Sequence, residues 1–482
     1  MVREHVDAVV VGAGPNGLTA AARLARAGRR VLVVEAGPTV GGGSRTAPIG
    51  QSARYDVCAA VHPFGASSPA FEALGLVDHG LRWCHPTIAL AHPFDDGSAA
   101  VLHRATAERP HATADLLGGD ADRWRLLIDS FAGDWERWRH LALGPVVRTT
   151  LRHPLAMAHF GAAAALPATA LWRLFRTRDA RALLAGMAAH SGAPLSMPTT
   201  AGVALALLAA GSAAGMPVAA GGSQAIIDAL ADVIREAGGT IETGRRIESV
   251  TQLPLARDVL FDVTPGQAAA MVGARAPRWR HGVAAWKLDL LLSGPLPWSA
   301  ESCRQAGTVH LGGEAAEIAC AERATTRGGL ADRPYVIVAQ PSVADPTRAE
   351  HGHHVIWAYR HVANGAHDPR ATTGIETQLD RFAPGWRNLE LDRRVTTPLA
   401  YEQYNAAYVG GDIAGGAMTP WQTVARPRLA LDPYRIRSTN GMHGHHDAAR
   451  TTGYWLCSQS TPPGPGVHGM SGWHAAGAVL DR

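Results

Sequence analysis

The first forty residues alternate apolar runs with glycine turns in the order of a strand, a helix and a second strand. Residues 7–11 form a continuous apolar run, which is typical of a central strand in a parallel sheet. A glycine-rich turn covers residues 12–17, and the next segment has the spacing of an amphipathic helix that ends near Gly28. A second apolar run leads to Glu35, so the pattern predicts a strand, helix and strand unit.

Later segments carry patterns that suit further parts of such a sheet. Residues 224–237 have one apolar helical stripe between two glycine turns. The stripe consists of Ile226, Ile227, Leu230 and Ile234. Residues 259–265 ("VLFDVTP") predict another strand, and residues 454–457 predict a strand before a loop rich in Ser, Pro and Gly. Small residues then open a final helix near Met470.

Two apolar stretches stand apart from this pattern. The run from Ala182 to Ile227 has no charged residue, but prolines and glycines interrupt it, so we predict buried helices with turns instead of a transmembrane span. Residues 282–292 ("GVAAWKLDLLL") are nearly all apolar, as in a strand that is buried on both faces, and they contain the one lysine of the chain, Lys287.

Length, charge and cysteine content narrow the class of protein. A chain of 482 residues predicts two or three folding units. The formal net charge of +4 is small and the arginines are dispersed, which argues against nucleic-acid binding. Five separated cysteines without a CxxC indicate neither a disulfide framework nor a redox dithiol nor a zinc site. The apolar run at the N-terminus is too short for a secretory signal, so we expect a cytoplasmic protein.

The glycine turn has the spacing of a dinucleotide-binding motif. Gly12 permits the tight turn, Gly14 lets the backbone approach a pyrophosphate, and Gly17 lets helix and strand pack closely. The helix N-terminus offers free N–H groups to phosphates, and Glu35 ends the second strand where a carboxylate can accept both ribose hydroxyls. This context predicts a dinucleotide site.

Residues after the second strand indicate which dinucleotide binds. The stretch "EAGPTVGGGSRTAPI" resembles the second motif of the FAD-dependent amine oxidase and phytoene desaturase clan. The closing stretch "STPPGPGVHG" resembles the last motif of bacterial phytoene-desaturase-like proteins, including those named for a pyridine-nucleotide-disulphide oxidoreductase domain. This resemblance implies FAD as the cofactor. The chain has no CxxC, and we find no second strand-GxGxxG-helix unit for NAD(P)H.

The resemblance extends over nearly the whole chain and implies an α/β fold. That fold is a glutathione-reductase-type Rossmann FAD domain with an inserted α+β substrate domain of mixed sheet plus helices. The FAD domain is expected to be assembled from residues 1–75, 216–275 and 401–482, and the substrate domain from residues 76–215 and 276–400.

The motifs and the resemblance together assign residues to the FAD site. The expected cofactor-binding residues are Gly12, Gly14, Pro15, Asn16, Gly17, Glu35, Ala36, Gly42, Gly43, Arg45, Thr46, Val250, Ser458, Gly466, Val467, His468 and Met470. Arg45 can donate to a phosphate or to the flavin through its planar guanidinium. The alternative is that Arg45 is a surface charge near a turn. Val250 is placed at the adenine by the resemblance alone.

Three side chains are candidates for the chemistry. The resemblance places Lys287 at a water near flavin N5, whereas the alternative is a core lysine paired with Asp289. His62 and His468 lie beside flavin-contacting loops and could act as bases, or they could be structural. No metal site is expected, because the histidines at 443, 445 and 446 lack a defined set of partners and read as an exposed insertion.

The resemblance implies an FAD-dependent oxidoreductase. We expect hydride removal from an apolar substrate (a polyene, isoprenoid or lipid-like molecule) to flavin N5, which leaves a C=C bond, with oxygen or a quinone as electron acceptor. A C–N oxidase that makes an imine and hydrogen peroxide remains an alternative, as does a flavin-carrying interaction protein without turnover. An Arg-edged apolar segment at residues 148–176 is either a mouth that contacts a membrane peripherally or an ordinary domain helix.

Overall fold

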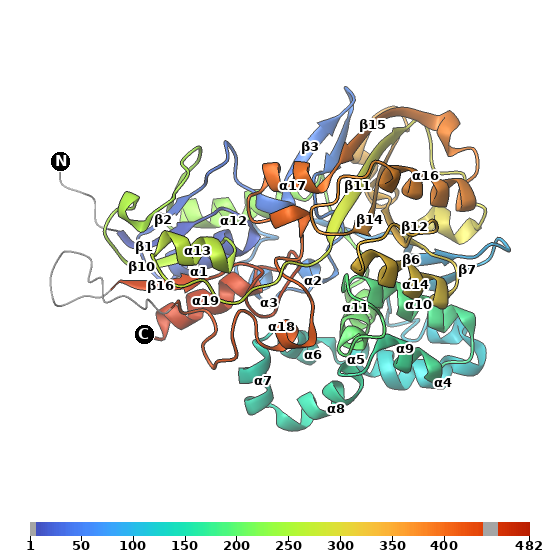
Figure 1. Ribbon diagram of the computed structural model, residues 1–482, viewed down its shortest axis with the longest axis horizontal. Helices are drawn as coiled ribbons and strands as arrows, with labels where there is room; N and C mark the ends of the chain where they lie inside the picture. The colour runs from blue at the N-terminus through green and yellow to red at the C-terminus, as the bar shows by residue number, and fades with distance from the viewer. Residues whose placement is uncertain (1–5, 437–451) are drawn as a thin grey trace.

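The computed structural model describes residues 6–436 and 452–482 and contains two main sheets (Figure 1). The first sheet has the strand order β16-β10-β1-β2-β9, and each neighbouring pair is parallel. Its strands are β1 (Val6–Val11), β2 (Val31–Val34), β9 (Thr240–Glu242), β10 (Ala256–Phe261) and β16 (Gly453–Leu456). All five come from the three segments expected to form the FAD domain, and helices cover the sheet as in a Rossmann unit.

The second sheet has the strand order β15-β11-β14-β13-β12-β6-β7 and is mixed. Only the β12–β6 pair is parallel among its described pairings. Its strands are β6 (Ile88–Pro93), β7 (Ala99–Leu102), β11 (Ala284–Leu292), β12 (Ala306–Leu311), β13 (Val336–Ala339), β14 (His354–Val362) and β15 (Glu390–Thr396). Two small sheets pair β3 (Thr46–Ile49) with β4 (Ala53–Asp56), and β5 (Trp83–Cys84) with β8 (Val218–Ala219).

Helices pack on both sheets and also form a separate group below the second one (Figure 1). The α-helices are α1 (Pro15–Arg26), α2 (Pro63–Ala66), α3 (Pro69–Ala73), α4 (Ala121–Trp124), α5 (Ser130–Gly133), α6 (Trp135–Ala142), α7 (Val146–Arg152), α8 (Pro154–Ala164), α9 (Ala168–Leu171), α10 (Arg178–Ala189), α11 (Thr200–Ala214), α12 (Gln224–Glu236), α13 (Pro265–Met271), α14 (Ala315–Thr326), α15 (Pro341–Ala344), α16 (Arg370–Phe382), α17 (Pro398–Tyr404), α18 (Pro420–Val424) and α19 (Met470–Leu480).

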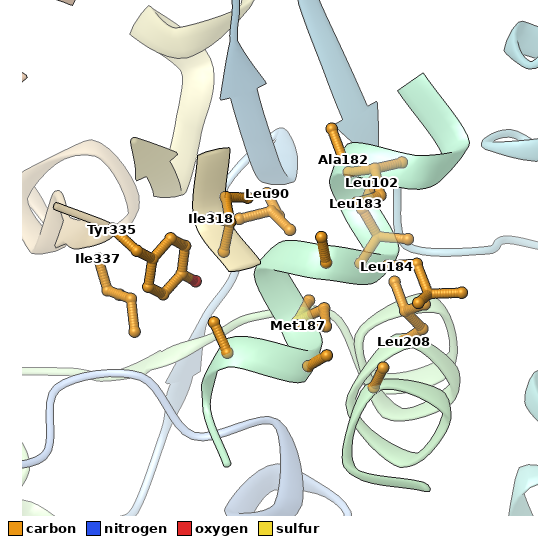
Figure 2. Packing of buried hydrophobic residues seen from close by; sticks show 14 of the residues in the cluster. Leu90, Leu102, Ala182, Leu183, Leu184, Met187, Leu208, Ile318, Tyr335 and Ile337 are labelled. Atoms are coloured by element: carbon orange, nitrogen blue, oxygen red, sulfur yellow. The ribbon is translucent and has the colours of Figure 1, made fainter. Parts of the chain in front are cut away.

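The hydrophobic core divides along these layers. In the FAD domain, α1 packs against both α12 and α19, and the buried stripe of α12 includes Ile226, Ile227 and Leu230. In the substrate domain, α10 lies between α11 and α14, and Leu183, Leu184 and Met187 of α10 fill the space between them (Figure 2). The uncharged run predicted to form buried helices therefore does so as α10, α11 and the start of α12.

The architecture confirms the expected fold class. It also shows β11 buried at all nine positions, as the apolar run around Lys287 predicts. No single helix among the described residues is long and apolar enough to cross a membrane, although α8 and residues Ala168–Leu174 pass that test together as a pair bent by 83°. The described residues contain no cluster of potential metal ligands, and the histidines at 443, 445 and 446 lie outside the described residues.

Candidate active site

One cavity of about 1320 Å³ runs from the glycine turn of the FAD domain to the second sheet. This volume exceeds the roughly 300–1,000 Å³ of most ligand pockets, so the cavity has room for more than one group. One half, which we call the dinucleotide half, is lined by Gly12–Asn16, Val34–Thr39, residues 42, 43 and 45, and residues 245–248. The other half lies between α7, α8, α11 and the second sheet, and we call it the substrate chamber.

The glycine turn leaves an open approach to the N-terminus of α1. Gly12 has φ +101°, a conformation that favours glycine. A Cβ atom at Gly14 would come within 2.6 Å of Oδ2 of Asp262, so only glycine leaves that backbone accessible. Pro15 and Asn16 begin α1 and also line the cavity, and the helix N-terminus there favours an anionic group.

Glu35 is fixed at the end of β2 by two backbone donors. Its carboxylate accepts the N–H of Ala13 at 2.8 Å and the N–H of Gly37 at 2.7 Å. Arg45 lies 3.7 Å from the same carboxylate and donates to the carbonyl of Thr39, which holds residues 36–45 over the cavity edge. Glu35, Ala36 and Arg45 all line the cavity, as the sequence predicts.

Two tyrosines that the motif reasoning missed hold the second glycine motif. The hydroxyl of Tyr404 donates to the carbonyl of Gly42 at 2.6 Å, and its ring lies under the Arg45 guanidinium at 5.3 Å. A Cβ at Gly43 would collide with the hydroxyl of Tyr408, so this approach also requires glycine. The signal in the sequence is the "YEQYNAAY" segment, but nothing local to it indicates contact with residues more than 300 positions earlier.

The closing loop brings Ser458 and residues 466–468 to the cavity. Gly466 has φ +129°, and the loop leads directly into α19. Nδ1 of His468 accepts the N–H of Met470 at 3.0 Å, so the ring proton must lie on Nε2. Burial lowers the pKa of His468 to about 4, and the ring therefore acts as a neutral structural group at neutral pH.

His62 also lines the cavity as a neutral ring. Its Nε2 lies 2.8 Å from Oγ of Ser223, and that hydroxyl donates its proton to the carbonyl of Ala59. Nε2 of His62 must therefore donate, which leaves Nδ1 as the acceptor. Burial lowers the pKa of His62 to about 4, so the ring is a weak base.

Four of the expected cofactor-binding residues lie behind the cavity wall. Gly17 packs against the carbonyl of Gly12, which is the packing role that its spacing predicts. Three expectations are corrected. Thr46 donates to Oδ1 of Asp56. Val250 starts a short 3-10 helix, and the nearby Ile247 lines the cavity instead. Met470, the first residue of α19, is buried against Ala70 of α3 and Leu143.

Lys287 does not line the cavity, so the expectation that it lies near flavin N5 is corrected. Its side chain is fully buried, and Nζ donates to the carbonyls of Asp56 at 2.6 Å and Val57 at 3.1 Å. Oδ1 of Asp289 lies 2.8 Å away as an ion pair. Two carbonyls and a carboxylate thus surround the ammonium. The next residue along the chain after Val57, Cys58, does line the cavity. The alternative of a core lysine paired with Asp289 describes this geometry.

The floor of the substrate chamber is one face of the second sheet. Trp357, Tyr359 and His361 are alternate residues of β14, so their side chains share this face, and all three line the cavity. Successive rings lie 5.0 and 5.5 Å apart. The motif search missed them, although alternation in "HVIWAYRHV" marks them as one face.

The rest of the chamber is largely apolar. Its remaining wall includes Val146, Met157, Phe160, Gly161, Val203, Ala206, Leu207, Met216, Val283, Ala285 and Ile337. Oγ1 of Thr308 and Nε1 of Trp357 are buried without a hydrogen-bond partner in the part of the chain that the structure describes, so two polar atoms remain available to a ligand.

These features fit FAD. The glycines at 12, 14, 42 and 43 leave backbone that a side chain would block, and Glu35 offers carboxylate oxygens next to an exposed helix N-terminus. Asp262 lies in the same half, accepts the N–H of Gly17 at 2.9 Å, and has its pKa raised by burial to about 7. A partly protonated carboxyl group there reduces repulsion with a phosphate.

Comparison with known proteins agrees with this site. The model of the NAD(P)-binding Rossmann-like domain matches residues 10–79. Pyridine nucleotide-disulfide oxidoreductase domain-containing protein 2 of Rattus norvegicus is 25% identical in an alignment that covers 99% of this chain and 94% of that protein. Phytoene desaturase (neurosporene-forming) of Rhodobacter capsulatus is 25% identical over 54% of this chain and 52% of its own length. One of the polypeptides of limonene dehydrogenase from Castellaniella defragrans is 35% identical, over 25% of this chain and 22% of that polypeptide.

Solved structures share the whole architecture at low sequence identity. An oxidoreductase from Methanosarcina mazei superposes with a TM-score of 0.60 at 17% identity, covering 99% of this chain and all of the other. Cyclohexylamine oxidase from Brevibacterium oxydans superposes with a TM-score of 0.57 at 16% identity, again covering 99% of this chain and all of the other. By its dinucleotide-binding domain and its relatives, the chain is an FAD-dependent oxidoreductase that is similar in sequence to a phytoene desaturase and in fold to an amine oxidase.

Proposed function

We propose that the protein removes a hydride from an apolar, isoprenoid or lipid-like substrate and thereby forms a C=C bond. The observation that carries this proposal is the lining of the substrate chamber, whose wall consists mainly of Met, Phe, Val, Leu, Ile and Ala side chains. An apolar wall favours a hydrocarbon ligand by the area it removes from water. Bound FAD supplies the two-electron oxidant, and the chain supplies binding, orientation and exclusion of water.

The alternative of C–N oxidation needs a site for an amine. A protonated amine in a buried chamber requires a carboxylate partner. Among the described lining residues outside the dinucleotide half, Asp412 is the acidic one, and its oxygens already accept the N–H groups of Gly282 at 2.8 Å and Ala414 at 2.9 Å. This occupied carboxylate favours the neutral apolar substrate over an amine.

The route into the chamber supports a peripheral contact with a lipid surface. Helix α8 has no buried residue, yet its Met157, Phe160 and Gly161 line the cavity. Leu155 of α8 is 86% exposed and Leu151 of α7 is 68% exposed, and Arg148 and Arg152 of α7 lie close to them in the chain. Apolar side chains edged by arginines suit the boundary between acyl chains and anionic headgroups. Figure 1 shows α7 and α8 at the lower edge of the molecule, below α11.

Oxygen or a quinone would then accept the electrons. A quinone fits the same route, because it is apolar and would reach the chamber from a lipid phase. Comparison of reoxidation by air and by a soluble quinone analogue separates the two acceptors.

The proposed function is tested by mixing the FAD-loaded protein anaerobically with a panel of probes. The panel consists of limonene and phytoene as hydrocarbons and cyclohexylamine and putrescine as amines. We expect loss of the oxidised flavin absorbance with a hydrocarbon only, and a product that has two hydrogens fewer than the probe. Reduction by an amine with imine formation, and none by either hydrocarbon, would contradict the proposal.

A further inference from the structure

Formation of a C=C bond removes a hydride from one carbon and a proton from its neighbour. The proton needs an acceptor within the chamber, because a largely apolar wall offers few hydrogen bonds to a water molecule that could accept it. A useful acceptor has a free lone pair that faces the chamber and a partner that stabilises the positive charge it acquires.

His361 meets both conditions. It is a residue of β14, is 7% exposed and lines the chamber. Its Nδ1 lies 2.9 Å from Oε2 of Glu322, a residue of α14 that is 1% exposed. A carboxylate can only accept a hydrogen bond, so Nδ1 carries the ring proton and Nε2 keeps a lone pair. Nδ1 makes the one hydrogen bond found for this ring among the described residues, and the residue lines the cavity.

One arginine and several neutral groups surround this pair. Arg360, the next residue before His361, interacts electrostatically with Glu322. Burial lowers the pKa of Arg360 to about 10, which still leaves it charged at neutral pH. The other titratable neighbours are uncharged, namely Tyr359 on the same strand, Tyr335 before β13 and His190 after α10. Strand β11 contributes Ala285 opposite His361.

The other histidines that line the cavity lack such an arrangement. His468 uses Nδ1 to accept the N–H of Met470, and His62 donates to Ser223 without a carboxylate behind it. His190 lies 3.1 Å from Nε2 of His310, and burial lowers the pKa of His190 to about 3. Protonation of His190 would place a cation against another imidazole with no carboxylate in contact with either ring.

We propose that His361, held and charge-stabilised by Glu322, is the proton acceptor of the dehydrogenation. This inference rests on the proposed function. The C–H bond on one carbon breaks with its proton going to Nε2 of His361, and the electron pair of that bond forms the second bond of the C=C. The hydride of the neighbouring carbon goes to bound FAD, which is the oxidant. Glu322 stabilises the imidazolium that forms and is a positioning residue.

The first test needs no turnover. Diethyl pyrocarbonate acylates unprotonated imidazole nitrogens, and peptide mass spectrometry locates the label. In the FAD-loaded protein at neutral pH we expect His361 to be labelled, limonene to protect it, and His468 to remain unlabelled as an internal control. An unlabelled His361 would overturn the proposal whatever the substrate is.

The second test uses whichever probe of the panel reduces the wild-type flavin. We expect His361→Gln and Glu322→Gln to slow flavin reduction by about 10²–10⁴-fold, the usual contribution of a general base, while FAD affinity and probe affinity stay unchanged. The pH dependence of flavin reduction should differ between the wild type and Glu322→Gln, because the variant lacks the carboxylate that stabilises the imidazolium.

Two results separate the proposals. Reduction of His361→Gln at the wild-type rate would overturn the role of His361. Absence of reduction by both hydrocarbons in the wild-type protein would instead contradict the proposed function, and an amine that reduces the flavin would then serve as the probe for His361.

Discussion

Lys287 shows how far a single residue can be interpreted from sequence. The apolar run around it predicts a strand that is buried on both faces, and β11 is such a strand. Alternation along that strand places Lys287 and Asp289 on one face, and they form an ion pair there. The resemblance placed the same ammonium at flavin N5. In the structure, however, Lys287 donates to the carbonyls of Asp56, at the end of β4, and of the next residue, Val57, and these contacts could not be predicted from the strand pattern alone.

Replacement of Lys287 should therefore affect stability first. Lys287→Met leaves the carboxylate of Asp289 and two carbonyls buried without their partner, so we expect a loss of about 3–5 kcal/mol in the free energy of unfolding. The double variant Lys287→Met, Asp289→Leu removes both charges and should recover most of that loss. Urea unfolding of the two variants measures the difference. A stable Lys287→Met variant whose reduced flavin reacts slowly with oxygen would show instead that the lysine reaches the flavin.

At the scale of elements, the local pattern of apolar residues was sufficient to predict individual helices and strands of the first domain. The expected helix at 224–237 is α12, and the expected strand at 454–457 is β16. The motif at Gly12 and the one at Gly42 also lie together as expected. His361 and Glu322 could not be paired from sequence, because β14 and α14 are joined only by tertiary packing.

Helix α8 is the element whose role the sequence left open. Its exposed apolar surface predicts binding to anionic vesicles of phosphatidylserine and phosphatidylcholine, measured by co-sedimentation. The variant Leu151→Glu, Leu155→Glu should lose most of this binding and keep its thermal stability, because both side chains are exposed.

A control places a glutamate at an exposed apolar position elsewhere. Val77 is 67% exposed and lies outside α7 and α8, so Val77→Glu should bind vesicles like the wild type. Equal vesicle binding by all three proteins would contradict a role for α8 at a lipid surface.

On the scale of the whole molecule, the sequence predicted the order of the parts better than their contacts. The strands of the first sheet come from three separate segments, and the glycine motifs locate each segment along the chain. The cavity depends on residues that no motif marks, because it is enclosed where α8, α11 and the second sheet meet the FAD domain. That Tyr404, Trp357 and His361 line the cavity follows only from that packing.

The central claim is that one cavity holds FAD in its dinucleotide half and an apolar substrate in its chamber. Ala206 of α11 lines the chamber, so Ala206→Phe should fill it and leave the dinucleotide half intact. Two quantities are measured: the rate of anaerobic flavin reduction by the hydrocarbon probe and the FAD dissociation constant. The control variant is Ala276→Phe, because Ala276 is exposed. We predict that Ala206→Phe binds FAD like the wild type and is reduced at least about tenfold more slowly, whereas reduction at the wild-type rate would contradict the account.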